Sequence, residues 1–358
     1  MILEPITAVA PFGEALVAWY RAGHRDLPWR RRADAYGVWL SEIMLQQTRV
    51  DTVVDYFLRF TAAFPTVRDL AQAEEQQVLK LWQGLGYYSR ARNLLKCARV
   101  VDGQYGGVFP RQWQAMRALP GVGDYTAAAV LSIAYGVPVA AVDGNVLRVI
   151  ARLAAWGEDI AQPQAKAQVK DYTEGYIPPL CAGDFTQAIM ELGAMVCKPQ
   201  NPTCDACPLA ALCRARELDL VGALPVKAAK KKPQREARAV LVARCGDRVL
   251  LRRRGEGLLT GMWEFPGEPI APGEPPEAAA GRLLAALGLE GDLSPLGQAR
   301  HVFTHRVWEM AVYQARCDAM AETPEGRWAD AATLDHLPIP TAMLKVAKLI
   351  GYVSPEPT

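Results

Sequence analysis

The chain has 358 residues with 40 basic and 38 acidic side chains, and hydrophobic residues make up 51% of it. This length allows two or three domains with separate cores, and the composition is that of an ordinary soluble globular protein. The sequence contains no apolar run of about 18 residues and no secretion signal. We therefore expect a cytoplasmic protein whose eight cysteines are thiols or metal ligands rather than disulfides.

The first predicted helix, over residues 12–22, has amphipathic spacing and is followed by a basic segment with a tryptophan, His24-Arg25-Asp26-Leu27-Pro28-Trp29-Arg30-Arg31-Arg32. Exposed cations beside an aromatic ring fit contact with phosphate groups and stacking on a base. A basic loop that is only solvated fits the same residues equally well, so this segment alone decides nothing.

The stretch Val38–Phe60 is predicted to be helical throughout. Glu42 lies in its nearly unbroken apolar part, where an ionised carboxylate would be poorly solvated. Desolvation raises the pKa of a carboxyl group and would keep Glu42 protonated as a general acid near neutral pH. A glutamate on the polar stripe of a helix is the simpler alternative, which this segment alone slightly favours. Gln46, Gln47 and Thr48 are neutral donors and acceptors that could contact bases.

Two further helices are predicted over about 67–83 and 89–101. The segment between them holds glycines around a leucine and two tyrosines, Gly84-Leu85-Gly86-Tyr87-Tyr88. A mobile loop with an apolar tip could insert into a base stack. Packing of the same side chains in the protein core is the alternative.

The stretch Arg117–Asn145 is the centre of the sequence pattern. It begins with a predicted tight turn between two helices, Leu119-Pro120-Gly121-Val122-Gly123. The second helix is predicted from near Asp124 to Gly136, which are good capping residues. The glycines allow close approach of the backbone, and the N-terminus of the helix offers free N–H groups, which together suit a phosphate oxygen. A turn that only connects two helices is the alternative.

Asp143 lies shortly after this hairpin, at the start of a predicted helix over Val146–Trp156. An aspartate at such a place is more often a cap or turn residue than a catalyst, by roughly three to one. A carboxylate close behind an anchor for the DNA backbone, in a chain that also contains Glu42, favours a chemical role.

Four cysteines follow within 17 residues, with the spacing C-x6-C-x2-C-x5-C, at Cys197, Cys204, Cys207 and Cys213. Four thiolates so close in sequence bind a metal ion or a cluster. Zinc sites usually present two close pairs of ligands. The spacing therefore favours an iron–sulfur cluster, with zinc as the alternative.

The sequence pattern changes after a segment rich in proline and lysine, Leu220–Arg238, which predicts a basic extended linker. Beyond it, short β runs are predicted at 237–244 and 248–253, a helix at about 276–287 and more strands over 307–316. These elements predict a second, α+β domain.

Together these motifs resemble the adenine-specific mismatch glycosylases of the MutY family, in the helix-hairpin-helix superfamily that includes endonuclease III. The resemblance covers nearly the whole chain and rests on SEIMLQQTRV, GLGYYSRARN, LPGVGDYTA, VDGNVLRV, the four-cysteine loop and the C-terminal domain. It implies a multidomain protein. An all-α helix-hairpin-helix glycosylase domain over 1–220 would carry a [4Fe–4S] loop at 197–213, followed by a basic linker at 221–236 and a Nudix-like α+β domain over 237–358.

The resemblance also implies roles for single residues. Glu42 would protonate the adenine, Asp143 would stabilise the sugar cation, and Tyr125 and Asn145 would support that pair. The family's positions around the extruded adenine match Arg25, Leu27, Trp29, Arg30 and Gln187. Its positions beside the opposite base match Gln47, Thr48, Leu85 and Tyr87. Its DNA-binding hairpin matches Gly121, Val122 and Gly123. Lyase members of the superfamily have a lysine where this chain has Tyr125, so the resemblance implies a monofunctional glycosylase.

The C-terminal domain departs from the Nudix hydrolases that it resembles. Those enzymes hold Mg²⁺ with a cluster of glutamates, whereas the corresponding stretch Gly281–Leu289 contains no carboxylate, so we expect no nucleotide hydrolysis. Phe303, Thr304 and His305 match the loop with which the family recognises 8-oxoguanine. Serine is usual at the middle position, and Thr304 keeps the hydroxyl group while adding a methyl group.

We therefore expect a monomeric adenine DNA glycosylase that acts on double-stranded DNA with adenine opposite 8-oxoguanine or guanine, located at the nucleoid if the source is bacterial. A thymine mismatch glycosylase is one alternative, but those enzymes resemble only the first domain. A DNA-binding module without catalysis is another, against which the presence of both Glu42 and Asp143 argues.

Overall fold

A computed structural model describes residues 3, 9–32, 34–228, 233–320 and 326–353. Residue contacts divide the chain into two compact units, one of Met1–Ala71 and Lys96–Lys230 and the other of Gln72–Leu95 and Lys231–Thr358. The lysines of the expected linker at 230–232 lie outside the described residues, and the expected domain boundaries stay a prediction. Within the described ranges, every helix is too short or too polar to cross a lipid bilayer.

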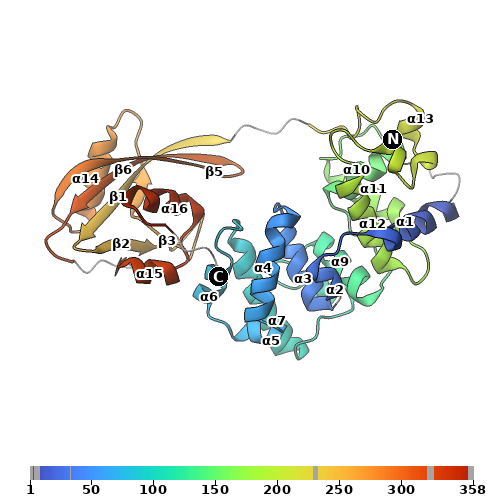
Figure 1. The fold of residues 1–358 in the computed structure, drawn as a ribbon, viewed down its shortest axis with the longest axis horizontal. Coiled ribbons are helices and arrows are strands. Elements are labelled where there is room, and N and C mark those ends of the chain that lie inside the picture. Colours follow the sequence, from blue (N-terminus) through green and yellow to red (C-terminus); the bar gives the residue numbers. More distant parts are fainter. Residues whose placement is uncertain (1–2, 4–8, 33, 229–232, 321–325, 354–358) are drawn as a thin grey trace. The chain divides into compact units, whose positions relative to one another are not determined.

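The first unit is helical, as expected, and Figure 1 shows α10 and α12 side by side in it. The core consists of apolar side chains that recur at helical spacing, such as Val146, Val149 and Ile150 of one helix and Phe185 and Ile189 of another. The helices are α1 (Val9–Gly23), α2 (Pro28–Arg31), α3 (Ala35–Leu45), α4 (Val50–Ala63), α5 (Val67–Gln72), α8 (Trp113–Arg117), α9 (Asp124–Tyr135), α10 (Gly144–Leu153), α11 (Pro163–Glu174), α12 (Ala182–Met195) and α13 (Arg214–Glu217), while α7 (Ser89–Tyr105) contributes residues to both units.

The predicted continuous helix over Val38–Phe60 is wrong, because α3 ends at Leu45 and α4 begins only at Val50. Gln47 adopts a φ of 60°, and a residue with left-handed backbone cannot continue a right-handed helix. The predicted helix over about 67–83 is likewise interrupted, between α5 and α6 (Glu75–Leu81). Apolar periodicity continues across both breaks, which is why the sequence pattern did not reveal them.

The predicted helical hairpin is confirmed, with α8 and α9 on either side of the glycine turn. Gly121 has a φ of 73°, which a side chain would oppose, and Gly136 ends α9 in the same left-handed conformation at 69°. The N-cap is Gly123, and Asp124 is the first residue of the helix rather than its cap.

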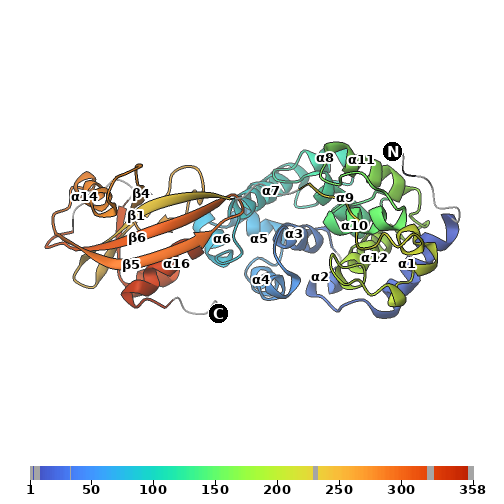
Figure 2. The ribbon, with the colours of Figure 1, turned by 90° about the horizontal axis from the view of Figure 1, so that it is seen from above.

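The second unit contains a seven-stranded sheet with the order β3-β2-β1-β6-β5, in which β4 also pairs with β1 and β7 with β2. Figure 2 shows β1, β6 and β5 side by side; β1 and β6 are parallel and the other pairs antiparallel. The strands are β1 (Gln234–Cys245), β2 (Arg248–Arg253), β3 (Trp263–Glu264), β4 (Gly267–Pro269), β5 (Asp292–Val302), β6 (Arg306–Arg316) and β7 (Gly326–Ala329), and the helices α6, α14 (Pro276–Ala286), α15 (Ala331–His336) and α16 (Thr341–Ala347).

The central strand β1 separates two environments, because successive side chains of a strand point to opposite faces. Ala239 and Leu241 belong to the clusters that pack with Ala280 and Leu283 of α14. Arg238, one residue along, is directed to the opposite face and is nevertheless buried. On that second face, Arg238 contacts Trp308 near the end of the β5–β6 hairpin.

Candidate active site

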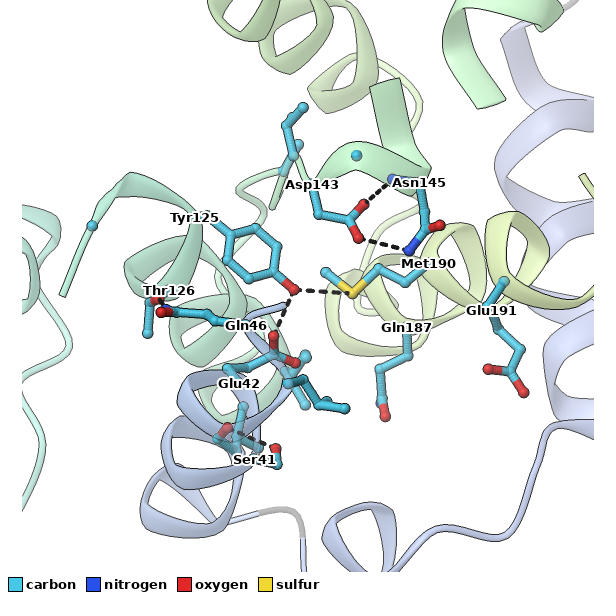
Figure 3. A pocket seen from close by; sticks show the side chains of 18 of the residues that line it. Ser41, Glu42, Gln46, Tyr125, Thr126, Asp143, Asn145, Gln187, Met190 and Glu191 are labelled. Carbon is cyan, nitrogen blue, oxygen red and sulfur yellow. Dashed lines mark hydrogen bonds between the residues drawn. The ribbon is translucent and has the colours of Figure 1, made fainter. Parts of the chain in front are cut away.

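A cavity of about 1040 Å³ lies in the first unit between α3, the α8–α9 hairpin, α10 and α12 (Figure 3). It collects side chains that are far apart in the sequence. The residues predicted for catalysis, Glu42, Tyr125, Asp143 and Asn145, all line it, together with the predicted substrate and DNA contacts Arg25, Leu27, Trp29, Arg30, Gln47, Thr48, Gly121, Gly123 and Gln187.

Glu42 projects from α3 into this cavity and is only 7% exposed. Burial raises the pKa of its carboxyl group to about 7, although a hydrogen bond from Tyr125 acts in the opposite direction. The Tyr125 hydroxyl group donates to Oε2 of Glu42 at 2.5 Å and lies 3.7 Å from the sulfur of Met190. Glu42 can therefore hold a proton near neutral pH, and the solvated glutamate that its sequence segment alone slightly favoured is not what the structure shows.

Asp143 is the N-cap of α10, so the common structural role of an aspartate at this place applies to it. Its Oδ1 accepts hydrogen bonds from the backbone N–H groups of Asn145 and Val146, each at 2.8 Å. Its Oδ2 accepts one from Nδ2 of Asn145, also at 2.8 Å. Burial raises the pKa of Asp143, while these three donors counteract that rise. The carboxylate also lines the cavity, and the cap therefore fixes its orientation there.

The two carboxyl groups have environments that separate their roles. Asp143 accepts three hydrogen bonds at a helix N-terminus, where the helix dipole favours negative charge. Glu42 is buried and accepts its side-chain hydrogen bond from Tyr125. The negative charge of Asp143 in turn raises the pKa of Glu42. The arrangement thus offers one proton donor and one anion on the wall of one cavity.

Glu191 on α12 is a cavity residue that the sequence analysis missed. It is 2% exposed and accepts hydrogen bonds from Arg25 at 2.9 and 2.6 Å and from Arg30 at 2.9 Å. Burial acts to raise the pKa of Glu191, but the two guanidinium groups lower it to about 2. A glutamate inside the apolar run Ala188–Gly193 was a signal of the same kind as Glu42 and could have been found in the same way.

Several predicted DNA contacts do not line this cavity. Val122 is buried inside the hairpin, and Leu85 is also buried, with 6% exposure, whereas Tyr87 is 42% exposed with a φ of 48°. Within the second unit, the hydroxyl groups of Tyr87 and Thr304 form a hydrogen bond. One residue predicted to contact the opposite base, Tyr87, is thus bonded to one predicted to recognise the lesion, Thr304.

The predicted metal ligands Cys197, Cys204, Cys207 and Cys213 are unpaired, half-buried thiols. They lie close enough that the other three interact electrostatically with Cys207. Among the described residues, however, no three His, Cys, Asp or Glu side chains are arranged to hold a single metal ion. The chemistry of four mutually close thiols fits a multinuclear cluster, whose sulfur ligands lie farther apart than those of one ion.

Two arginines of α10 bind the backbone of this cysteine loop. Arg152 donates to the carbonyl oxygen atoms of Lys198 at 2.7 Å and Pro199 at 3.2 Å. Arg148 donates from Nε to the carbonyl oxygen of Cys197 at 2.8 Å and from Nη2 to Oδ1 of Asn145 at 2.7 Å. The same helix that begins at the cavity therefore also anchors the cysteine loop.

Comparisons with known proteins match both parts of the chain. Residues 40–175 match the family described as HhH-GPD superfamily base excision DNA repair protein, and residues 238–349 match the NUDIX domain. The adenine DNA glycosylase of Homo sapiens is 36% identical over 97% of this chain and 75% of its own length, and that of Rattus norvegicus is 36% identical over 97% and 79%. The structure of a thermostable thymine-DNA glycosylase is similar to 58% of the chain, with 30% identity, 95% of that protein covered and a TM-score of 0.52.

Proposed function

The chain belongs to the adenine DNA glycosylase family, and we propose that it removes adenine paired with 8-oxoguanine or guanine from double-stranded DNA. Adenine excision in base excision repair is the activity of this family. One observation supports the chemistry most strongly: the buried Glu42, whose pKa is about 7, and the capped Asp143 line the same cavity. The thymine glycosylase likeness is limited to 58% of the chain, whereas the adenine glycosylases match 97%.

Glu42 donates the proton and Asp143 stabilises the positive charge that develops. Adenine is a poor leaving group until it is protonated, which a carboxyl group that is neutral near pH 7 can achieve. As the bond to the sugar breaks, positive charge develops on the sugar, and a fixed carboxylate held by three donors stabilises it with little reorganisation. A transient covalent adduct with Asp143 would be a variant of the same step.

Tyr125 supports a monofunctional enzyme. Its pKa lies well above the ordinary value because of burial and the nearby Glu42 and Asp143, so the phenol stays neutral and is no nucleophile. Strand cleavage by a lyase requires an amine that forms a Schiff base with the sugar. At this position the hydroxyl group instead donates to Glu42 and orients it.

The cavity is the place for the extruded adenine, because the bonds of a stacked base are inaccessible inside the duplex. Leu27 and Trp29 supply apolar surface, while Arg25, Arg30 and Gln187 supply donors around it. The backbone N–H groups of the first turn of α9, which begins after Gly123, would hold the DNA backbone. Gln47, Thr48, Leu85 and Tyr87 would contact the duplex at the opposite base.

The second unit would recognise 8-oxoguanine through the loop of Phe303, Thr304 and His305, in which Thr304 and His305 are exposed. Its Nudix-like fold carries no glutamate cluster in α14, so a role in binding rather than hydrolysis is proposed. We propose that the protein acts as a monomer in the compartment that holds the DNA.

Cys197, Cys204, Cys207 and Cys213 would hold a [4Fe–4S] cluster. Its contribution would be structural, because glycosidic hydrolysis as written above transfers no electrons. Arg148 and Arg152 bind the loop backbone and place positive charge beside Cys197, which suits thiolate ligands.

The decisive experiment measures single-turnover base release from four duplexes, with A or T opposite 8-oxoguanine or G. We expect adenine to be released from both duplexes that contain A, and faster when it is opposite 8-oxoguanine. The DNA strand should not be cleaved unless alkali is added. Release of thymine at a rate equal to that of adenine would contradict the proposed function. Thr304→Ala should reduce the preference for 8-oxoguanine, while Thr304→Ser, which keeps the hydroxyl group, should retain it.

A further inference from the structure

Phe303 of the proposed recognition loop packs in an aromatic stack at the end of the β5–β6 hairpin. Phe303 follows the last residue of β5, and its N–H group donates to the carbonyl oxygen of Arg306 at 2.7 Å, which closes the β5–β6 hairpin. The Phe303 ring meets His301 edge-on at 4.5 Å and Trp308 edge-on at 4.9 Å between centroids. His301 and Trp308 are directly opposite each other in the β5–β6 pair. The conformation of Phe303 therefore depends on both neighbouring rings.

Trp308 is the base of this stack and is 1% exposed. The guanidinium group of Arg238 lies 4.6 Å from the centroid of its ring, and that of Arg254 lies 5.6 Å away. The indole N–H of Trp308 has no hydrogen-bond partner among the described residues, and neither does Nε of either arginine. The ring is thus positioned by packing and by cation–π contact rather than by a hydrogen bond.

Both arginines are themselves held by hydrogen bonds to acceptors of the second unit. Arg254 donates to both carboxylate oxygens of Glu264, at 2.9 and 2.8 Å, and Glu264 is 2% exposed. Arg238 donates to the carbonyl oxygen of Gly267 at 3.0 Å and to Glu236 at 2.5 Å. Charge-assisted hydrogen bonds of this kind restrict the movement of the guanidinium groups.

We propose that Trp308, packed against Arg238 and Arg254, is a positioning residue for lesion recognition, because it sets the position of Phe303 and hence of the exposed Thr304. This inference rests on the proposed function of the loop. Trp308 is buried and cannot contact DNA, so it acts through Phe303. A recognition group must be held to within about 0.5 Å of its productive position by its neighbours. The arginine–tryptophan cluster supports the loop from behind through Phe303, while Tyr87 contacts the hydroxyl group of Thr304.

The first test compares Trp308→Leu, Trp308→Phe and the control Val312→Ala in the full-length protein. Val312 is a buried residue of the same strand and face, but it lies away from the loop, so its truncation removes core volume without touching the aromatic stack. Trp308→Leu should lower the preference for 8-oxoguanine over guanine by about 3- to 10-fold, as expected for loss of edge-to-face contacts. Release of adenine opposite guanine should stay within about twofold of wild type, because the first-unit cavity is unchanged.

Trp308→Phe keeps an edge-to-face partner for Phe303 and should fall between wild type and Trp308→Leu. Val312→Ala should lower thermal stability but leave the preference unchanged, a combination that separates positioning from general destabilisation. If Trp308→Leu does not fold, Trp308→Phe decides alone: a preference equal to that of wild type would overturn the inference.

The second test does not depend on activity. Hydrogen exchange at the amide of Phe303 should be faster in Trp308→Leu than in wild type and unchanged in Val312→Ala. Unaltered exchange in Trp308→Leu would overturn the inference whatever the enzyme prefers. If wild type itself shows no preference for 8-oxoguanine, or Thr304→Ala keeps it, the proposed function of the loop fails. A preference lost in Thr304→Ala but kept in Trp308→Leu would sink only the positioning role.

Discussion

The hydroxyl group of Tyr125 and the carboxyl group of Glu42 form a hydrogen bond of 2.5 Å between α9 and α3. Tyr125 is the donor, so the bond favours the ionised form of Glu42 and opposes the effect of burial on its pKa. The phenol therefore moderates the acidity of the proposed proton donor, in addition to orienting it.

Base release should fall as the pH rises above about 7, because Glu42 must be protonated to act and its pKa is about 7. Tyr125→Phe removes the bond that lowers this pKa. The pKa of Glu42 should then rise, and the alkaline limb of the profile of rate against pH should move to higher pH. The measurement is single-turnover release of adenine between pH 5 and pH 9.

Tyr135→Phe is the matched control, because the Tyr135 hydroxyl group donates to the backbone oxygen of Phe109 and does not line the cavity. It should leave the alkaline limb in place. A limb that moves to lower pH in Tyr125→Phe would contradict the assignment of Glu42 as the acid.

Asp143→Asn should reduce base release by about 10²–10³, the usual cost of removing one electrostatic stabiliser of a transition state. Asparagine is as good an N-cap as aspartate, so α10 should still form and DNA binding should survive. Excision rates and fluorescence anisotropy with a labelled duplex measure the two effects separately. Asp55→Asn, at an exposed aspartate of α4 that does not line the cavity, should change neither excision nor folding. Excision by Asp143→Asn at a rate close to that of wild type would remove Asp143 from the mechanism.

Glu191→Gln should lower the free energy of unfolding by about 1–3 kcal/mol near pH 7, because it removes a charged acceptor shared by Arg25 and Arg30. The folded-state pKa of Glu191, about 2, lies below its ordinary value, so its stabilisation is fully present above about pH 4.5 and is lost as the pH falls towards 2. The difference between wild type and variant should therefore shrink in acid.

Urea unfolding at pH 7, 5 and 3 measures this difference. Asp184→Asn is a suitable comparison, because Asp184 lies on the same helix as Glu191. It forms a largely exposed ion pair with Arg21 of α1. The Asp184→Asn substitution should change the free energy of unfolding little at pH 7, 5 or 3. A Glu191→Gln difference that grows towards pH 3 would contradict the assigned ion pairs.

The purified protein should be brown and contain iron and inorganic sulfide in equal amounts. Cys207→Ser should fold poorly, because metal binding by such loops is coupled to folding. Cys245→Ser, at a half-buried thiol of the second unit, should keep the full iron content. Elemental analysis decides, and zinc without iron would overturn the proposed cluster.

Much of the site was predictable from sequence because its signals are local. The hairpin follows from glycine and capping preferences within a few residues, and the β2 strand and α14 from short-range patterns. The apolar residues around Glu42 suggested a buried carboxyl group, although the segment alone slightly favoured a solvated one. The family motifs then assigned roles to side chains whose proximity no local pattern contains.

Tertiary structure decided the remainder. The left-handed backbone of Gln47 separates α3 from α4, and Asp143 is both a cap and a cavity residue. The bond between Tyr125 and Glu42 joins positions 83 residues apart, and those from Glu191 to Arg25 span 166. Such pairs form only when packing brings distant helices together, so periodicity and propensity, which extend over a few residues, carry no information about them.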